Sequence, residues 1–218
     1  MYSPIIFDLD GTLLNTLGDL ASAGNYALSE LGFPTHEENS YKLFVGNGIP
    51  KLIERILPTG FSEGEFNEAY RLFCEYYAVH SADKTLPYDG ISELLEELCA
   101  KNITCLCNTN KSHGFAEALL RRFFGDKLTE IVGGEHGYPK KPAPDAARYL
   151  AEKYRTEGCL PLYVGDSSVD MQTAKNAGID ACGVLWGFRT RGELSQFKPK
   201  FLVENVNELK CVIMNGKN

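Results

Sequence analysis

The stretch that most constrains the fold runs from Pro4 to Leu14 and reads PIIFDLDGTLL. An apolar run typical of a buried strand ends in two carboxylates, Asp8 and Asp10, and Gly11 and Thr12 follow directly. Because successive side chains of a strand point to opposite sides, we expect Asp8 and Asp10 to start from the same side of the chain. Ligands of open α/β sheets bind outside the carboxyl ends of the strands, and two adjacent acids are costly unless they share a cation or a proton. The stretch therefore predicts a metal site, a carboxylate nucleophile with a general acid beside it, or both.

Composition narrows the class of protein. A chain of 218 residues suits one large domain, or one domain with an insert. The net charge of -7 and the absence of any basic block argue against nucleic acid and anionic membranes as partners. Asp8 and Asp10 interrupt the first apolar run, so we expect neither a signal peptide nor a membrane span, and cytoplasm is the expected location. The seven cysteines lack a metal-ligand spacing and are predicted to be free thiols in a reducing compartment.

The pattern along the chain predicts two domains. Residues 15–82 carry helical periodicity and no convincing strand, whereas short apolar strands alternate with helices from residue 86 onward. Such alternation predicts a parallel sheet with right-handed crossovers, which the strand at residues 4–8 would join. We therefore expect an α/β fold, with a Rossmann-like parallel sheet flanked by helices in residues 1–14 plus 83–218. A small all-α domain, residues 15–82, is inserted after the first strand.

Four polar motifs follow predicted strands or open predicted helices. They are Asp8-Leu9-Asp10-Gly11-Thr12, Thr109-Asn110-Lys111 after a strand at Ile103–Cys107, Lys140-Lys141-Pro142, and Gly165-Asp166-Ser167-Ser168-Val169-Asp170, where Ser168 is the expected helix cap. Their order and content resemble the four motifs of the phosphatases of the haloacid dehalogenase superfamily. The resemblance covers nearly the whole chain, and it includes the insertion after the first motif, which is similar to the helical cap of that superfamily.

The resemblance implies a division of roles. Asp8 would be the nucleophile that forms an aspartyl-phosphate, and Asp10 would protonate the leaving oxygen and later take a proton from water. Mg²⁺ would be bound by Asp8, the backbone carbonyl of Asp10, and Asp166, since hard oxygen ligands suit this ion. Lys141 would balance the negative charge, and Asp170 would support the site through water or Lys141.

Two neighbouring residues have less certain roles from sequence alone. Thr109 resembles the hydroxyl residue that binds a phosphoryl oxygen together with the following backbone amide, although a turn or N-cap threonine would fit the same pattern. Asn110 would line the phosphate pocket or adopt a left-handed turn.

The predicted cap contains a second candidate site. The stretch Phe44-Val45-Gly46-Asn47-Gly48-Ile49-Pro50, with Lys51 and Arg55, most resembles phosphoglycolate phosphatases. Gly46, Asn47 and Gly48 would offer backbone amides at a helix N-terminus to a substrate carboxylate. A plain loop-to-helix junction, with Lys51 and Arg55 as surface charges, is the alternative.

The favoured function is Mg²⁺-dependent hydrolysis of a small phosphorylated metabolite, with phosphoglycolate as the first candidate substrate. Pyrophosphatase, sugar-phosphate phosphatase and β-phosphoglucomutase activities remain as alternatives. A signalling receiver domain, which also uses acids, Mg²⁺, Thr and Lys, is disfavoured because it has no cap insertion. A non-catalytic phosphate-binding relative is disfavoured because Asp8, Asp10, Thr109, Lys141 and Asp166 are all present. The oligomeric state has no signature in the sequence.

Overall fold

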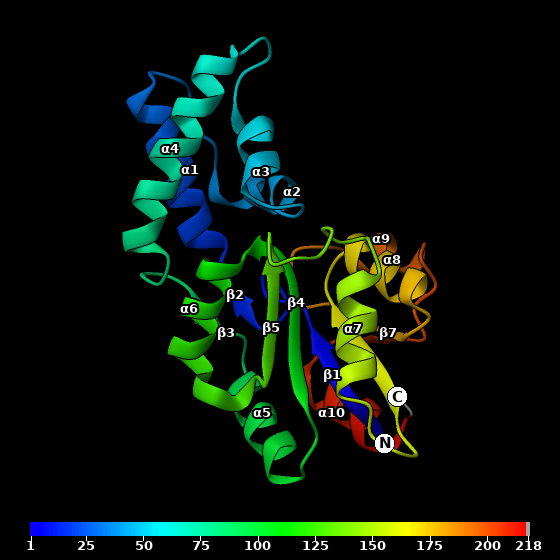
Figure 1. The fold of residues 1–218 in the computed structure, drawn as a ribbon. Coiled ribbons are helices and arrows are strands. Elements are labelled where there is room, and N and C mark those ends of the chain that lie inside the picture. Colours follow the sequence, from blue (N-terminus) through cyan, green and yellow to red (C-terminus); the bar gives the residue numbers. More distant parts are fainter. Residues whose placement is uncertain (217–218) are drawn as a thin grey trace.

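The computed structural model describes residues 1–216, in which six parallel strands form the central sheet (Figure 1). The strand order is β5-β4-β1-β6-β7-β8. Their bounds are β1 Tyr2–Phe7, β4 Cys105–Ser112, β5 Glu130–Gly134, β6 Leu160–Gly165, β7 Asp180–Val184 and β8 Phe201–Val203. After β1 the later strands are added first on one side, as β4 and β5, and then on the other, as β6 to β8. The order therefore reverses at β1, where open α/β sheets bind their ligands.

Helices cover both faces of the sheet, and alternate residues of each strand pack against one layer or the other. Ile5 and Phe7 of β1 pack with helices α5 (Ile91–Ala100), α6 (His113–Phe124) and α10 (Val206–Asn215). Ile6 packs on the opposite face with α7 (Asp145–Lys153), α8 (Ser168–Ala177) and α9 (Arg191–Ser195). Burying each such side chain contributes about 1.5–3 kcal/mol. The predicted α/β fold class is confirmed, and β1 is the buried centre of the sheet.

Residues between β1 and α5 form a separate helical layer above the carboxyl edge of the sheet (Figure 1). Its helices are α1 (Leu17–Glu30), α2 (Tyr41–Phe44), α3 (Ile49–Ile56) and α4 (Glu63–His80), with a short 3-10 turn at Glu38–Ser40. Their apolar faces share one cluster, which is distinct from the two clusters on the sheet. Helix α4 begins with the capping box predicted from Ser62 and Glu65.

Two short strands connect the helical layer to the sheet. β2 (Leu14–Asn15) pairs antiparallel with β3 (Leu86–Pro87), so both crossing segments run side by side. The carboxylate of Asp19, at the start of α1, is buried and accepts hydrogen bonds from the backbone amides of Lys84 and Thr85 and from the Thr85 hydroxyl. This carboxylate ties the outgoing and returning segments together.

Two local sequence predictions were wrong, the end of one strand and one helix cap, and one open alternative is decided. The strand predicted at Ile103–Cys107 is β4, Cys105–Ser112, so Thr109, Asn110 and Lys111 lie inside the strand and Asn110 is not in a left-handed turn. Gly133 and Gly134 of β5 allow this, because a Cβ on Gly134 would lie 2.9 Å from the Asn110 carbonyl oxygen. Helix α8 is capped by Ser167, whose extended backbone lets its hydroxyl accept from the Asp170 amide, rather than by Ser168.

No helix among residues 1–216 combines the length and the apolar character that crossing a membrane requires.

Candidate active site

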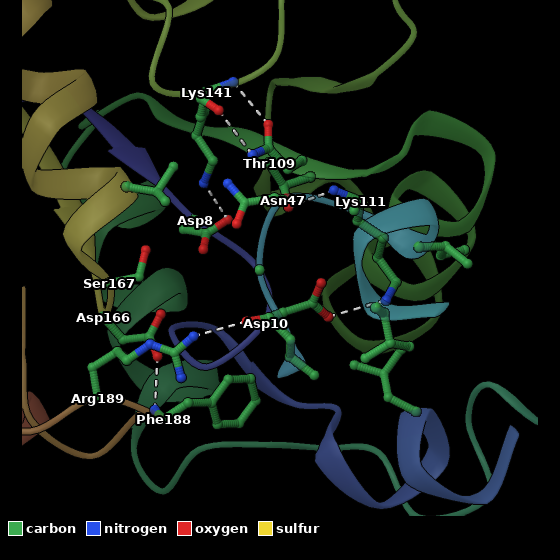
Figure 2. Close-up of a pocket in the computed structure, with 18 residues that line it drawn as sticks. Asp8, Asp10, Asn47, Thr109, Lys111, Lys141, Asp166, Ser167, Phe188 and Arg189 are labelled. Atoms are coloured by element: carbon green, nitrogen blue, oxygen red, sulfur yellow. Dashed lines mark hydrogen bonds and ion pairs between the residues drawn. The ribbon is translucent and has the colours of Figure 1, made fainter. Parts of the chain in front are cut away.

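A pocket lies where the carboxyl ends of β1, β4 and β6 meet the loop between α2 and α3 (Figure 2). Each strand supplies side chains to it from its end or from the residues that follow. The pocket thus brings together residues from all four predicted motifs and from the predicted cap. The predicted site residues that line it are Asp8, Asp10, Gly46, Asn47, Gly48, Thr109, Asn110, Lys141 and Asp166.

Lys141 lies between two buried carboxylates. Its Nζ is 2.8 Å from Oδ1 of Asp8 and donates to Oδ1 of Asp170 at 2.6 Å. Burial, and then repulsion by Asp170, raise the pKa of Asp8 to about 7, although Lys141 opposes this shift. Burial opposes the charge of Lys141, but Asp170 and Asp8 outweigh it and raise the pKa of the lysine. Lys141 is therefore a fixed cation beside Asp8, as the third motif predicts for a charge-balancing residue.

Asp166 follows β6 and is almost completely buried. Its Oδ2 accepts a hydrogen bond from the Phe188 amide at 2.7 Å. Burial first, and then repulsion by Asp170 and Asp8, hold the pKa of Asp166 well above its usual range. Two glycines make room for this carboxylate, because a Cβ on Gly11 or Gly187 would lie 2.3 Å from an atom of Asp166. Gly11 also has a φ of +85°, which glycine adopts without strain.

The donor set fits a divalent metal ion. Carboxylate oxygens of Asp8, Asp166 and Asp170 lie within 4.8 Å of one another. Both oxygens of Asp170 are already bonded, to Lys141 and to Ser167, so Asp8 and Asp166 have the free ligand capacity. Oδ1 of Asp8 is buried and makes no hydrogen bond within residues 1–216, despite its ion pair with Lys141. A hard cation would relieve the mutual repulsion that raises the pKa values of Asp8 and Asp166.

Asp10 has different neighbours from Asp8. Its Oδ1 accepts from the Thr16 hydroxyl at 2.6 Å and from Nζ of Lys111 at 3.0 Å. Thr16 is the residue before α1, and the Lys111 ammonium lies 4.8 Å from the centroid of the Tyr77 ring in α4. The second acid of the pair is therefore bonded to both the sheet and the helical layer, and in Figure 2 it lies between Asp8 and Lys111.

Thr109 and Asn110 are placed differently in the pocket. The Thr109 hydroxyl accepts from the Lys111 amide at 3.2 Å and remains able to donate. The side-chain amide of Asn110 bonds the backbone of Lys141 twice, accepting from its N–H at 2.8 Å and donating to its carbonyl at 3.1 Å. Asn110 therefore fixes the loop that carries Lys141.

The loop Gly46–Gly48 borders the pocket just before α3. All three residues have positive φ values, of 109°, 70° and 88°. Arg55 of α3 holds the loop by donating to the carbonyls of Phe44 and Gly46 and to the Asn47 side chain. Lys51 is also exposed, but its ammonium pairs with Glu54.

Sequence reasoning missed three residues at the pocket, Lys111, Phe188 and Arg189. Arg189 donates to the carbonyls of Lys42 and Val45 in the helical layer, from a loop after β7. The sequence carried one usable signal for Lys111, because it directly follows the motif residues Thr109 and Asn110. The stretch Trp186-Gly187-Phe188-Arg189-Thr190 resembles a loop of phosphoglycolate phosphatases, but its sequence predicts no catalytic role and does not show that the loop reaches Asp166.

With this geometry established, comparison with known proteins identifies the family. The model of the haloacid dehalogenase-like hydrolases matches residues 5–184. The chain belongs to this family of hydrolases. It is 34% identical over 216 residues to phosphoglycolate phosphatase of Vibrio parahaemolyticus, a match that covers 96% of this chain and 95% of the relative.

Solved structures of relatives extend the comparison. A crystal structure from Haemophilus somnus, named a "predicted phosphoglycolate phosphatase", has a TM-score of 0.88 and 31% identity. The match covers 97% of this chain and 98% of that one. CbbY from Rhodobacter sphaeroides, in complex with xylulose-1,5-bisphosphate, gives a TM-score of 0.71 and 25% identity over 93% of this chain and 94% of that one. This chain is thus a hydrolase of the phosphoglycolate phosphatase-like subfamily.

Proposed function

We propose that the protein is a Mg²⁺-dependent phosphatase that hydrolyses a small phosphate monoester through an aspartyl-phosphate on Asp8. The observation that carries the proposal is the ion pair of Asp8 with Lys141, beside the buried carboxylate of Asp166. A carboxylate oxygen of Asp8 would attack phosphorus, and the bond to the leaving oxygen would break. Uncatalysed hydrolysis of phosphate monoesters is among the slowest reactions known, so a covalent route of two easier steps is a large advantage.

Asp10 would handle the proton. It would donate to the leaving oxygen in the first step and accept a proton from the attacking water in the second. Its bonds to Thr16 and Lys111 hold this carboxyl group at the pocket side of the helical layer. Lys141 would neutralise the phosphoryl oxygens, and Thr109 would bind one of them together with the backbone amide of Asn110.

Mg²⁺ would be held by Asp8, by the backbone carbonyl of Asp10 and by Asp166. When bound, it neutralises phosphoryl charge and orients the nucleophile. Asp170 would act through Lys141, since both of its carboxylate oxygens are already bonded.

We further propose that residues 15–82 form a cap domain on a core of residues 1–14 plus 83–218. Caps of this kind close over a bound phosphate and select the leaving group. The relatives named phosphoglycolate phosphatase make 2-phosphoglycolate the first substrate to test, with its carboxylate near the amides of Gly46, Asn47 and Gly48. A reducing compartment such as the cytoplasm suits the seven cysteines, all of which are free in the described chain.

The test is phosphate release from a panel of substrates, with Mg²⁺ and with EDTA. The panel contains 2-phosphoglycolate, pyrophosphate, glucose phosphates and p-nitrophenyl phosphate. We expect Mg²⁺-dependent release that is fastest with 2-phosphoglycolate. Release from none of the substrates would contradict the phosphatase function, whereas a best substrate without a carboxylate would contradict only the substrate assignment.

A further inference from the structure

Lys111 is a buried cation with unused N–H donors. Its side chain is only 2% exposed, although lysine is almost never fully buried without partners. The ammonium has three N–H donors, and within residues 1–216 it makes one hydrogen bond, to Asp10. The Tyr77 hydroxyl beside it is also buried and has no partner in the same part of the chain. The Lys111 ammonium, which lines the pocket, thus keeps N–H donors for a ligand.

The other cations that line the pocket are already assigned. Lys141 is bound between Asp8 and Asp170, on the opposite side of Asp8 from Lys111 (Figure 2). Arg189 donates to two carbonyls of the cap. Lys111 is therefore the cation placed to meet a negative group beyond the one that reacts at Asp8.

Lys111 is also close to the proposed phosphate site. Its backbone amide donates to the hydroxyl of Thr109 at 3.2 Å, and the side chains of both residues line the pocket. Apolar residues of the cap, Leu20, Ile49 and Leu52, line the same pocket. An anion placed among apolar side chains is costly unless a cation pairs with it. A short substrate with a second negative group would find that cation in Lys111.

We propose that Lys111 binds the second anionic group of the substrate, a carboxylate in the first instance, and so selects phosphate monoesters that carry one. The inference rests on the proposed phosphatase function and assigns its substrate class. The carboxylate would accept a hydrogen bond from the free N–H donors of Lys111. The backbone amides at Gly46–Gly48 carry partial charges only, so Lys111 supplies the full charge that tells a carboxylate from a hydroxyl.

The test compares two substrates that differ at one group, 2-phosphoglycolate and 2-hydroxyethyl phosphate. The wild type should prefer 2-phosphoglycolate in kcat/KM by about 30-fold or more, the range expected for one hydrogen bond to a charged group. Lys111→Met should reduce this preference by about 30-fold, mainly through KM for 2-phosphoglycolate. Lys111→Arg keeps the charge and should restore part of the preference. Lys101→Met is the control, because Lys101 is exposed, is paired with Glu97 and precedes the start of β4, far from the pocket, and it should leave the preference unchanged.

The outcomes separate this inference from the phosphatase function. Equal kcat/KM values for the two substrates in the wild type would overturn the role of Lys111 without any variant. A preference that survives Lys111→Met would overturn it too, as would equal losses on both substrates, which would mean that Lys111 acts only through Asp10. In all three cases Mg²⁺-dependent phosphate release by the wild type would still support the proposed function, which fails only if no substrate of the panel is hydrolysed.

Discussion

The carboxyl edge of the sheet and the cap loop Gly46–Gly48 line the same pocket, but they are built differently. At the sheet edge, Asp8, Asp166 and Lys141 are buried and charged, and they hold one another through ion pairs and repulsion. The cap loop presents backbone groups, and the exposed Arg55 holds it from outside. We therefore expect substitutions at the sheet edge to have the larger effects, because each charge there depends on its neighbours, and substitutions around the loop to have smaller ones.

The largest effect is expected at the sheet edge with Asp8→Asn. Loss of a catalytic nucleophile typically reduces the rate by at least about 10⁴-fold, and we expect that here in phosphate release. The metal-free variant should melt at or above the wild-type temperature, since the change removes one of several mutually repelling carboxylates. Wild-type turnover by Asp8→Asn would contradict its role as the nucleophile.

Lys141→Met should damage both activity and stability. Removing the ammonium leaves Asp8 and Asp170 without their cation, and breaking such a buried pair costs about 3–5 kcal/mol in the free energy of unfolding. Phosphate release should fall by about 10³-fold. Urea denaturation and a phosphate assay measure the two effects. Lys140→Met is the control and should change the free energy of unfolding by less than about 0.5 kcal/mol. Similar results for the two lysines would remove the distinction between the buried edge and its surroundings.

The stability of the metal-free protein should fall as pH rises, because Asp8 at the sheet edge loses its proton. The pKa of Asp8 is raised to about 7 in the folded protein from 3.8, so the folded state binds this proton more tightly than the unfolded state. The free energy of unfolding in EDTA should therefore fall as pH rises from about 4 to about 7, by the order of a few kcal/mol.

Thermal unfolding at pH 5.5 and pH 8 measures this dependence. In EDTA the melting temperature should be lower at pH 8, and Mg²⁺ should restore more of it at pH 8 than at pH 5.5. Asp8→Asn should show a smaller pH dependence than the wild type. If instead the melting temperature of the wild type in EDTA rose from pH 5.5 to pH 8, and rose more than that of Asp8→Asn, the raised pKa of Asp8 would be contradicted.

The smallest effect is expected in the cap, with Arg55→Met. The loop would lose its bonds from the guanidinium to the Phe44 and Gly46 carbonyls and to Asn47. We expect KM for 2-phosphoglycolate to rise by about 3–10-fold while kcat changes little, as for a loss of uniform binding. Lys51→Met is the control on the same helix and should leave KM unchanged. A kcat that falls as far as in Lys141→Met would show that the cap loop takes part in the chemical steps.

The parts that the sequence predicted well are those that local patterns determine. The apolar run before Asp8, the alternation of strand and helix after residue 86, and the capping box at Ser62 all follow from periodicity and short-range hydrogen bonds. They were sufficient for the fold class and for the assembly of four motifs at one sheet edge.

The parts that were missed depend on contacts between distant segments. Thr109 to Lys111 read as residues after a strand, but the two glycines of β5 allow β4 to continue through them. For Asn110 the sequence left open a place in the pocket lining or a left-handed turn, and it could not show that the side-chain amide bonds the backbone of Lys141, 31 residues away. Arg189 and Lys42 lie 147 residues apart in sequence, and no periodicity reports such a pairing.

The central claim, that Asp8 forms a covalent aspartyl-phosphate, can be tested by trapping it. Wild-type enzyme is quenched during turnover of 2-phosphoglycolate with Mg²⁺ and treated with borohydride, which reduces an acyl phosphate to the alcohol. Peptide mass spectrometry should then find homoserine at residue 8. Control samples incubated with substrate in EDTA, without Mg²⁺, should contain none. Steady phosphate release with residue 8 unmodified, or with the modification at another carboxylate, would contradict the account.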